Sequence, residues 1–300
     1  MAASDQWSRW VLGTRNSQAT DAVARWGRWL CAVRDQVLAH AQLGDGTIVL
    51  DVGAGDGLIA FGALERVGAT GQVIFCDISQ PLLDHSQAFA DQLGMRDHCR
   101  FVQASADHLQ PVADASVDVV TTRSVLIYVA DTAAALREFW RVLKPGGRIS
   151  LFEPINRFMV QQPATRFSWQ GYDVTPVLEL AERIRAAYHR SAAEQDPMLA
   201  FDERDLLRWC EQAGFTEIHL ALYIDLQPPE PEPWDALLTT PGNPLAPALG
   251  EVMAQVLTRD EAERFAAHLR PQVEAGRGTK RSAVVYLWAT KGGEQEGGAS

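Results

Sequence analysis

Three glycines at alternate positions follow an acidic residue early in the chain. Asp51 ends a run of apolar residues, and the glycines come directly afterwards at Gly53, Gly55 and Gly57. Glycines at this spacing let the backbone turn sharply at the carboxyl end of a strand and let a ligand lie against bare main chain. The dinucleotide fingerprint G-x-G-x-x-G would need its third glycine at position 58, where this chain has Leu58. The loop therefore predicts a ligand-binding turn other than the usual dinucleotide one.

A second acidic residue stands at the end of the next predicted strand. Asp77 follows Gly57 by 20 residues, and Ile78 comes after it. In a doubly wound sheet the carboxyl ends of neighbouring strands line one crevice, where a carboxylate can accept both hydroxyls of a ribose. Ile78 would offer an apolar face to an adenine. This pattern indicates an adenosine-containing ligand without specifying which one, and a capping or solvent-facing role for Asp77 is the alternative.

Alternating strand and helix patterns position these residues. The strand candidates are short and mostly rich in Val and Ile, and they span 47–51, 72–77, 99–104, 117–122 and 148–153. Helical patterns separate them, which favours a doubly wound, mostly parallel α/β sheet covered on both faces. Helix 132–143 stops at the breaker Lys144-Pro145-Gly146-Gly147. The strand predicted at 218–226 alternates apolar and polar residues, which is typical of a strand near a sheet edge.

An N-terminal extension and two interruptions divide the chain. We expect a helical cap at 1–43, a ligand-binding core at 44–156, a helical lid insertion at 157–200, a continuation of the core at 201–227, a second helical insertion at 228–278, and a final core strand and tail at 279–300. The tryptophans of the cap recur at helical spacing and are expected to pack it onto the core. Alternatively, Trp7, Trp10 or Arg15 closes over a ligand. In the second insertion, Thr258 and Glu261 match a capping box.

The composition argues against several classes of protein. The chain has 300 residues, of which 47% are hydrophobic, and this suffices for a sizeable core. A net charge of −11 argues against nucleic acid as a binding partner. The four cysteines form no C-x-x-C pair, so buried free thiols are expected. We see no signal peptide and no apolar run of about 20 residues, so we expect a cytoplasmic protein without a membrane span, monomeric or homodimeric.

The glycine loop, the acidic residues beyond it and a helix that ends at Leu143-Lys144-Pro145-Gly146-Gly147 together resemble the class I S-adenosylmethionine-dependent methyltransferases. The likeness is to the small-molecule group that contains the ubiquinone-type enzymes, and it covers about 44–156, 201–227 and 279–290. It implies a seven-stranded sheet whose last strand is antiparallel, with a Rossmann-like core that holds S-adenosylmethionine over the glycine loop. Transfer of the methyl group would leave S-adenosylhomocysteine.

The resemblance also implies roles for particular residues. Asp51 and the backbone near the glycines would hold the methionine part, Asp77 the ribose, and Asp107 with the backbone before it the adenine. Arg123 and Ser124 would lie near the sulfonium. The full set of implied cofactor-binding residues is Asp51, Gly53, Ala54, Gly55, Asp77, Ile78, Ala106, Asp107, Arg123 and Ser124. The histidines and acidic residues show no ligand spacing, so no metal is expected.

Residues near the later strand ends are candidates for catalysis and substrate binding. Methyl transfer needs the acceptor in line behind the sulfonium methyl, and it needs a general base only if the acceptor is a hydroxyl or an acidic carbon. Glu153, at the end of the fifth strand, is the candidate base or substrate anchor. The alternative is a structural carboxylate bonded to loop N–H groups or to an arginine. Substrate contacts are predicted at Tyr128, Asn156, Tyr172 and Tyr188.

The two insertions and several short motifs bear on the methyl acceptor and on alternative functions. The apolar content of the insertions favours a hydrophobic or amphipathic small acceptor. A non-catalytic S-adenosylmethionine-binding module or partner subunit would keep the same loop and acidic residues. Leu58 and the Lys-Pro-Gly-Gly signature oppose a nicotinamide-dependent oxidoreductase. Thr122-Arg123-Ser124-Val125 departs from the run expected in DNA amino-methyltransferases, and the dispersed cysteines oppose arsenite methylation.

Overall fold

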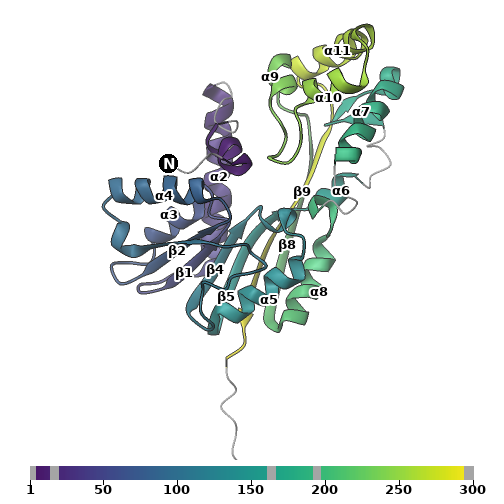
Figure 1. The fold of residues 1–300 in the computed structure, drawn as a ribbon. Coiled ribbons are helices and arrows are strands. Elements are labelled where there is room, and N and C mark those ends of the chain that lie inside the picture. The colour runs from purple at the N-terminus through teal and green to yellow at the C-terminus, as the bar shows by residue number, and fades with distance from the viewer. Residues whose placement is uncertain (1–4, 14–19, 161–166, 192–196, 294–300) are drawn as a thin grey trace, which may run out of the picture. The chain divides into compact units, whose positions relative to one another are not determined.

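The computed structural model describes residues 5–13, 20–160, 167–191 and 197–293 (Figure 1). The chain forms two compact units. The first contains residues 1–154, 203–222 and 284–300, and the second contains residues 155–202 and 223–283. The N-terminal helices and the glycine loop thus belong to the first unit. Arg15 lies outside the described residues.

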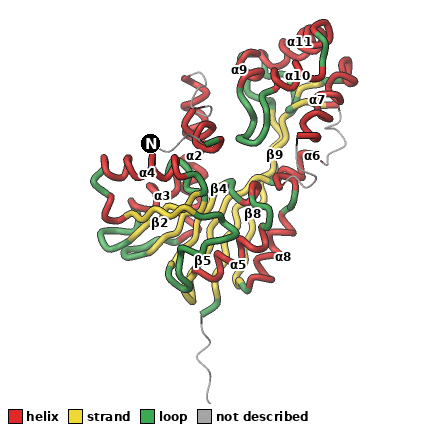
Figure 2. Tube along the Cα trace, in the orientation of Figure 1, coloured by secondary structure: helices red, strands yellow, loops and turns green. Residues whose placement is uncertain are grey.

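The main sheet has seven strands in the order β3-β2-β1-β4-β5-β9-β8 (Figure 2). The strands are β1 (Ile48–Val52), β2 (Gln72–Asp77), β3 (Cys99–Gln103), β4 (Val117–Arg123), β5 (Leu143–Pro154), β8 (Phe215–Gln227) and β9 (Lys280–Lys291). The neighbours from β3 to β5 pair in parallel, and the last strand, β9, pairs antiparallel with β5. The predicted fold is confirmed, and β8 lies at the predicted edge.

Helices cover both faces of this sheet, with α3 and α4 on one face and α5 and α8 on the other (Figure 1). The helices and helical turns of the first unit are α1 (Gln6–Ser8), η1 (Arg9–Gly13), α2 (Thr20–Ala41), α3 (Leu58–Leu64), α4 (Gln80–Gln92), η3 (Arg96–His98), η4 (Leu126–Tyr128), α5 (Thr132–Val142) and α8 (Glu203–Ala213). Side chains cap three of them: Asp5 accepts from the N–H of Ser8 at α1, Ser79 from that of Leu82 at α4, and Asp131 from that of Ala134 at α5.

The central strands are buried because helices pack on both of their faces. Val49 and Leu50 of β1 are fully buried, as are Val37 and Leu38 of α2. Val37, Leu38 and Val49 belong to one hydrophobic cluster, which also contains residues of α3 and β2. The predicted N-terminal cap therefore contributes α2 to the core that supports the glycine loop.

The second unit has a hydrophobic core of its own. Its elements are α6 (Asn156–Val160), β6 (Ser168–Trp169), β7 (Tyr172–Asp173), η6 (Thr175–Val177), α7 (Leu178–Ser191), η7 (Pro197–Leu199), α9 (Trp234–Thr239), α10 (Leu249–Val256) and α11 (Arg259–Glu274). Buried side chains from both predicted insertions, such as Ile184 and Phe265, share one cluster. The capping box predicted at Thr258 and Glu261 is confirmed at the start of α11.

Some local predictions differ from the structure. Helix α5 ends at Val142, and β5 begins at the next residue, because the Lys-Pro-Gly-Gly segment joins the sheet through a shift in register against β4. Cys76, Cys99 and Cys210 are buried free thiols as expected, whereas Cys31 is exposed on α2. Among the described residues, no helix has the length and apolar character needed to cross a membrane.

Candidate functional site

The glycine loop after β1 has a backbone that only glycine adopts easily. Gly53, Gly55 and Gly57 have φ angles of +68°, +57° and +86°. A Cβ on Gly53 would lie 2.2 Å from a methyl group of Val125, so the loop is in close contact with the segment after β4. A Cβ on Gly55 would meet nothing closer than 3.9 Å. The loop is therefore tightly held at Gly53 and has free space beside Gly55.

Asp77 attaches this loop to the end of β2. Its Oδ2 accepts from the N–H of Gly55 at 2.8 Å, and its Oδ1 accepts from that of Ser79 at 2.9 Å. Burial raises the pKa of the Asp77 carboxyl, and the hydrogen bonds from backbone N–H groups oppose this shift. Each carboxylate oxygen can accept more than one hydrogen bond. Asp77 can therefore organise the loop and still receive ribose hydroxyls, while the side chain of its neighbour Ile78 is 46% exposed.

Asp51 is buried between β1 and β4. Its Oδ1 accepts from the hydroxyl of Thr121, the residue beside it in the sheet, at 2.8 Å. Burial raises the pKa of Asp51 to about 7, although the Thr121 hydroxyl and the charge of Arg123 oppose this shift. The side chain is only 2% exposed. Asp51 thus supports the loop from beneath, and any effect on a ligand would pass through the backbone that follows it.

A tight turn after β3 presents the predicted adenine-binding residues. The N–H of His108 donates to the carbonyl of Ser105 at 3.0 Å, and the Ser105 hydroxyl donates to Oδ1 of Asp107 at 2.5 Å. Ala106 is buried and Asp107 is partly exposed. The N–H of Ala104 donates to the carbonyl of Asp77 at 3.1 Å. The turn therefore lies directly beside the end of β2, as the predicted contacts with one adenosine require.

Glu153 holds the turn after β4. Its Oε1 accepts from the N–H groups of Val125 at 2.9 Å and Leu126 at 3.0 Å, while Oε2 is buried without a hydrogen-bond partner among the described residues. The side chain is completely buried. Burial raises its pKa to about 7, opposed by backbone N–H groups and by the charge of Arg123. This geometry favours the structural alternative that the sequence left open, because an acceptor cannot reach the carboxylate without a movement of the turn.

The same turn contains the predicted sulfonium neighbours. Arg123 ends β4, and Ser124 has a φ of +55°, with its N–H donating to the carbonyl of Phe152 at 2.8 Å. Tyr128 follows in η4, where the ring of Trp7 meets its ring edge-on with centroids 5.0 Å apart. Burial raises the pKa of Tyr128 to about 12, and the charge of Glu153 adds to this shift. Trp7 thus packs against a predicted substrate residue.

The other predicted substrate residues belong to the second unit. Tyr172 is 1% exposed and packs in the hydrophobic core of that unit, which leaves no surface for a ligand. The Tyr188 hydroxyl donates to the carbonyl of Pro247 at 3.3 Å, and its pKa is raised to about 12 by burial. The Nδ2 of Asn156 is buried with no partner among the described residues. Asn156, Tyr172 and Tyr188 thus belong to the second unit, whereas Tyr128 belongs to the first.

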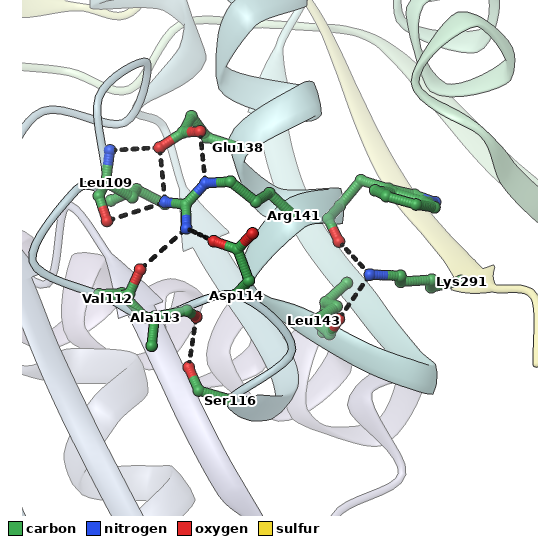
Figure 3. Close-up of polar contacts among 10 residues, drawn as sticks. Leu109, Val112, Ala113, Asp114, Ser116, Glu138, Arg141, Leu143 and Lys291 are labelled. Carbon is green, nitrogen blue, oxygen red and sulfur yellow. Dashed lines mark hydrogen bonds and ion pairs between the residues drawn. The ribbon is translucent and has the colours of Figure 1, made fainter.

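Sequence analysis missed an ion pair on α5. Glu138 and Arg141 hold the chain segment between β3 and β4 (Figure 3). The i, i+3 spacing on a helix was the available signal, but such pairs are common on solvated helix faces. Within the described residues, no group of three or more His, Cys, Asp or Glu side chains could hold a metal ion.

Known proteins resemble this chain in sequence. A family model described as a methyltransferase domain matches residues 50–151. A tRNA 5-carboxymethoxyuridine methyltransferase of Escherichia coli strain K12 is 33% identical over 149 residues, which are 49% of this chain and 53% of that protein. The chain thus spans about half the length of that relative. A demethylmenaquinone methyltransferase of Lactiplantibacillus plantarum is 32% identical over 188 residues, which are 62% of this chain and 77% of that protein.

A solved structure resembles this chain in fold. The geranyl diphosphate C-methyltransferase of Streptomyces coelicolor A3(2), bound to S-adenosyl-L-homocysteine, Mg²⁺ and a geranyl thiolodiphosphate, has a TM-score of 0.51. It is 18% identical, and the match covers 87% of this chain and 75% of that one. At this identity the likeness concerns the fold alone.

Proposed function

Because this chain belongs to the class I S-adenosylmethionine-dependent methyltransferases, we propose that it transfers the sulfonium methyl of S-adenosylmethionine to a small, hydrophobic or amphipathic organic acceptor. The observation that carries this proposal is the hydrogen bond between Asp77 and the N–H of Gly55. It joins the glycine loop to the strand end that would bind the ribose. We expect the protein to act in the cytoplasm, as a monomer or a homodimer.

The proposed cofactor contacts come from four neighbouring strand ends. The loop at Gly53, Ala54 and Gly55 would lie against the methionine part, with Asp51 supporting it from below. Asp77 would accept the ribose hydroxyls, and Ile78 would lie against the adenine. The turn at Ala106 and Asp107 would bind the adenine edge, since an aspartate accepts from the exocyclic amino group and the backbone N–H donates to the ring. Arg123 and Ser124 would border the sulfonium.

The chain's main contribution to the reaction would be to position the acceptor. An in-line arrangement that excludes water can lower a barrier by roughly 7–11 kcal/mol in favourable systems. Glu153 is proposed to shape the turn that borders the sulfonium. A second role is as a general base, worth about 10²–10⁴-fold for a hydroxyl or carbon acceptor, and it would use Oε2 after a movement of the turn. Tyr128 of the first unit remains the proposed acceptor contact, whereas Asn156 and Tyr188 stay predictions.

The charge of the chain bears on the class of acceptor. One relative is named for demethylmenaquinone and another for a nucleotide in tRNA. The net charge of −11 favours the small molecule, because a polyanion such as tRNA is usually bound by a basic surface.

The experiment begins with calorimetric titration of S-adenosylhomocysteine into the full chain. We expect binding, and we expect Asp77→Asn to weaken it by about 1–2 kcal/mol, the cost of a charge-assisted hydrogen bond. Asp84→Asn is the matched control, because Asp84 is an exposed residue of α4 whose Oδ1 accepts from the side chain of Gln80 at 2.7 Å. No binding by the wild-type chain would contradict the proposed function.

The second stage follows transfer of a labelled methyl group from S-adenosylmethionine. The acceptors offered are hydrophobic phenols, quinols and carboxylic acids, with total tRNA as a separate sample. Transfer to a small acceptor supports the proposal. Transfer to tRNA alone would contradict the acceptor class, and cofactor binding without transfer to any sample would favour the non-catalytic binding module.

A further inference from the structure

The segment between β3 and β4, residues 104–116, carries the turn with Asp107 but has little regular structure of its own. One of its residues, Leu109, is held by hydrogen bonds to both of its backbone polar groups. The N–H of Leu109 donates to Oε2 of Glu138 at 2.7 Å, and its carbonyl accepts from Nη2 of Arg141 at 3.0 Å. The Leu109 side chain is fully buried. The chain is therefore fixed only two residues beyond Asp107.

Arg141 holds the same segment at two further points (Figure 3). Its Nη1 donates to the carbonyl of Val112 at 3.0 Å and to Oδ1 of Asp114 at 2.5 Å. The guanidinium is itself fixed by Glu138, which accepts from Nε at 2.7 Å and from Nη2 at 2.8 Å. All three guanidinium nitrogens thus have partners, and each partner lies on α5 or on the segment between β3 and β4.

The charges of the pair support each other. Hydrogen bonding to Arg141 lowers the pKa of Glu138, and hydrogen bonding to Glu138 raises the pKa of Arg141. Both groups therefore stay charged at neutral pH. A planar guanidinium presents five donors in fixed directions, whereas a lysine ammonium has three donors on one atom and cannot replace all the hydrogen bonds that Arg141 makes to Glu138, Asp114 and the two carbonyls.

We propose that Glu138 and Arg141, named here the 138–141 clamp, are positioning residues that set how the turn after β3 recognises the adenine of the cofactor. Neither Glu138 nor Arg141 is among the proposed cofactor contacts. It fixes Leu109 and Val112, and so it limits where Asp107 can lie relative to the end of β2. This inference rests on the proposed function, because it assigns the adenine to that turn. It adds a specificity role for helix α5, which contributes none of the proposed cofactor contacts.

The test compares S-adenosylhomocysteine with S-inosylhomocysteine, which carries a carbonyl oxygen where adenine has its amino group. The wild-type chain should prefer the adenosyl compound by about tenfold or more, since the inosyl oxygen faces the Asp107 carboxylate and a charge-assisted bond is lost. Arg141→Lys should reduce this preference at least about fivefold, because the loosened turn no longer enforces the contact. A merely structural role would lower thermal stability and leave the ratio of the two dissociation constants unchanged.

A double-mutant cycle makes the inference sharper. In the Asp107→Asn background, Arg141→Lys should change the preference by less than about twofold, since both substitutions act through one contact. Glu138→Gln is the second variant if Arg141→Lys folds poorly, because it keeps the side-chain shape and an acceptor for Leu109 while it removes the charge that holds Arg141. Arg208→Lys is the matched control, an arginine of α8 paired with Asp205 three residues earlier.

The possible results separate two failures. Absence of S-adenosylhomocysteine binding by the wild-type chain contradicts the proposed function itself. Wild-type binding with an undiminished preference in both Arg141→Lys and Glu138→Gln would overturn the clamp while the proposed function stands. An equally large effect of Arg141→Lys in the Asp107→Asn background would also overturn it.

Discussion

Gly53 is the residue at which the proposed cofactor loop meets the turn after β4. Its φ of +68° already disfavours any side chain, and a Cβ would lie 2.2 Å from Val125. Val125 is fixed in turn because its N–H donates to Glu153. Gly146 offers a comparison, since its φ is +78° and a Cβ there would meet nothing within 4 Å. The two glycines share the backbone conformation and differ in the space around them.

We expect Gly53→Ala to weaken S-adenosylhomocysteine binding at least about tenfold. The added methyl group would displace Val125 and so change the loop, and the positive φ would strain the backbone of the alanine. Gly146→Ala should cost about 1 kcal/mol of unfolding free energy and leave the affinity unchanged. Calorimetric titration and urea unfolding of both variants measure these effects. Equal affinity in the two variants would refute the role given to the contact with Val125.

Helix α5 depends on a lysine from a distant strand. The last carbonyls of a helix have no partner within it. Nζ of Lys291, from β9, donates to the carbonyls of Trp140 at 2.9 Å and Leu143 at 2.7 Å, and it lies 3.8 Å from the centre of the Trp140 ring. Lys291 is only 8% exposed. A cation at this end of a helix is also favoured by the helix dipole. The antiparallel strand thereby fastens the helix that carries the 138–141 clamp.

Lys291→Met should lower the free energy of unfolding by about 1.5–3 kcal/mol, because it removes charge-assisted hydrogen bonds and leaves two carbonyls unpaired. Urea unfolding followed by circular dichroism measures the loss. Lys280→Met, at the exposed start of the same strand, is the control and should change stability by less than about 0.5 kcal/mol. A similar loss in both variants would mean that the helix end is not the cause.

Two buried carboxyl groups make the stability of the whole protein depend on pH. Burial raises the pKa of Asp51 from 3.8 to about 7 and that of Glu153 from 4.5 to about 7. Between the unfolded and folded pKa values the folded chain binds more protons than the unfolded chain. Stability from these groups is therefore greatest at acidic pH and is lost as the pH rises through about 7, where the carboxylates must ionise while buried.

We expect the urea midpoint of the wild-type chain to include a contribution from these two groups that falls between about pH 4 and about pH 7. Glu153→Gln removes one titrating group. The difference between the urea midpoints at about pH 4 and about pH 7 should therefore be smaller in this variant than in the wild-type chain. Comparing the pH dependence of the two proteins cancels the contribution of groups that titrate in both. An identical dependence on pH in the two proteins would show that Glu153 does not titrate in this range.

At the scale of the whole chain, local signals predicted the elements well. Strands β1 and β2 were recognisable because their residues are nearly all buried and mostly apolar, and the acidic residues at 51 and 77 were found because each follows such a run directly. The glycine loop needed no tertiary information, since alternate glycines allow φ values that other residues avoid.

Only the tertiary structure decided what the side chains contact. It buried Glu153 under the N–H groups of a turn 27 residues or more away in sequence, and it placed Tyr172 in the core of the second unit. In the folded chain Glu138 and Arg141 form hydrogen bonds with the backbone of Leu109, whereas the sequence alone showed only a charged helix face. The physical reason is that backbone conformation follows from neighbouring residues, whereas burial, hydrogen-bond partners and pKa values depend on groups that folding brings together from distant parts of the chain.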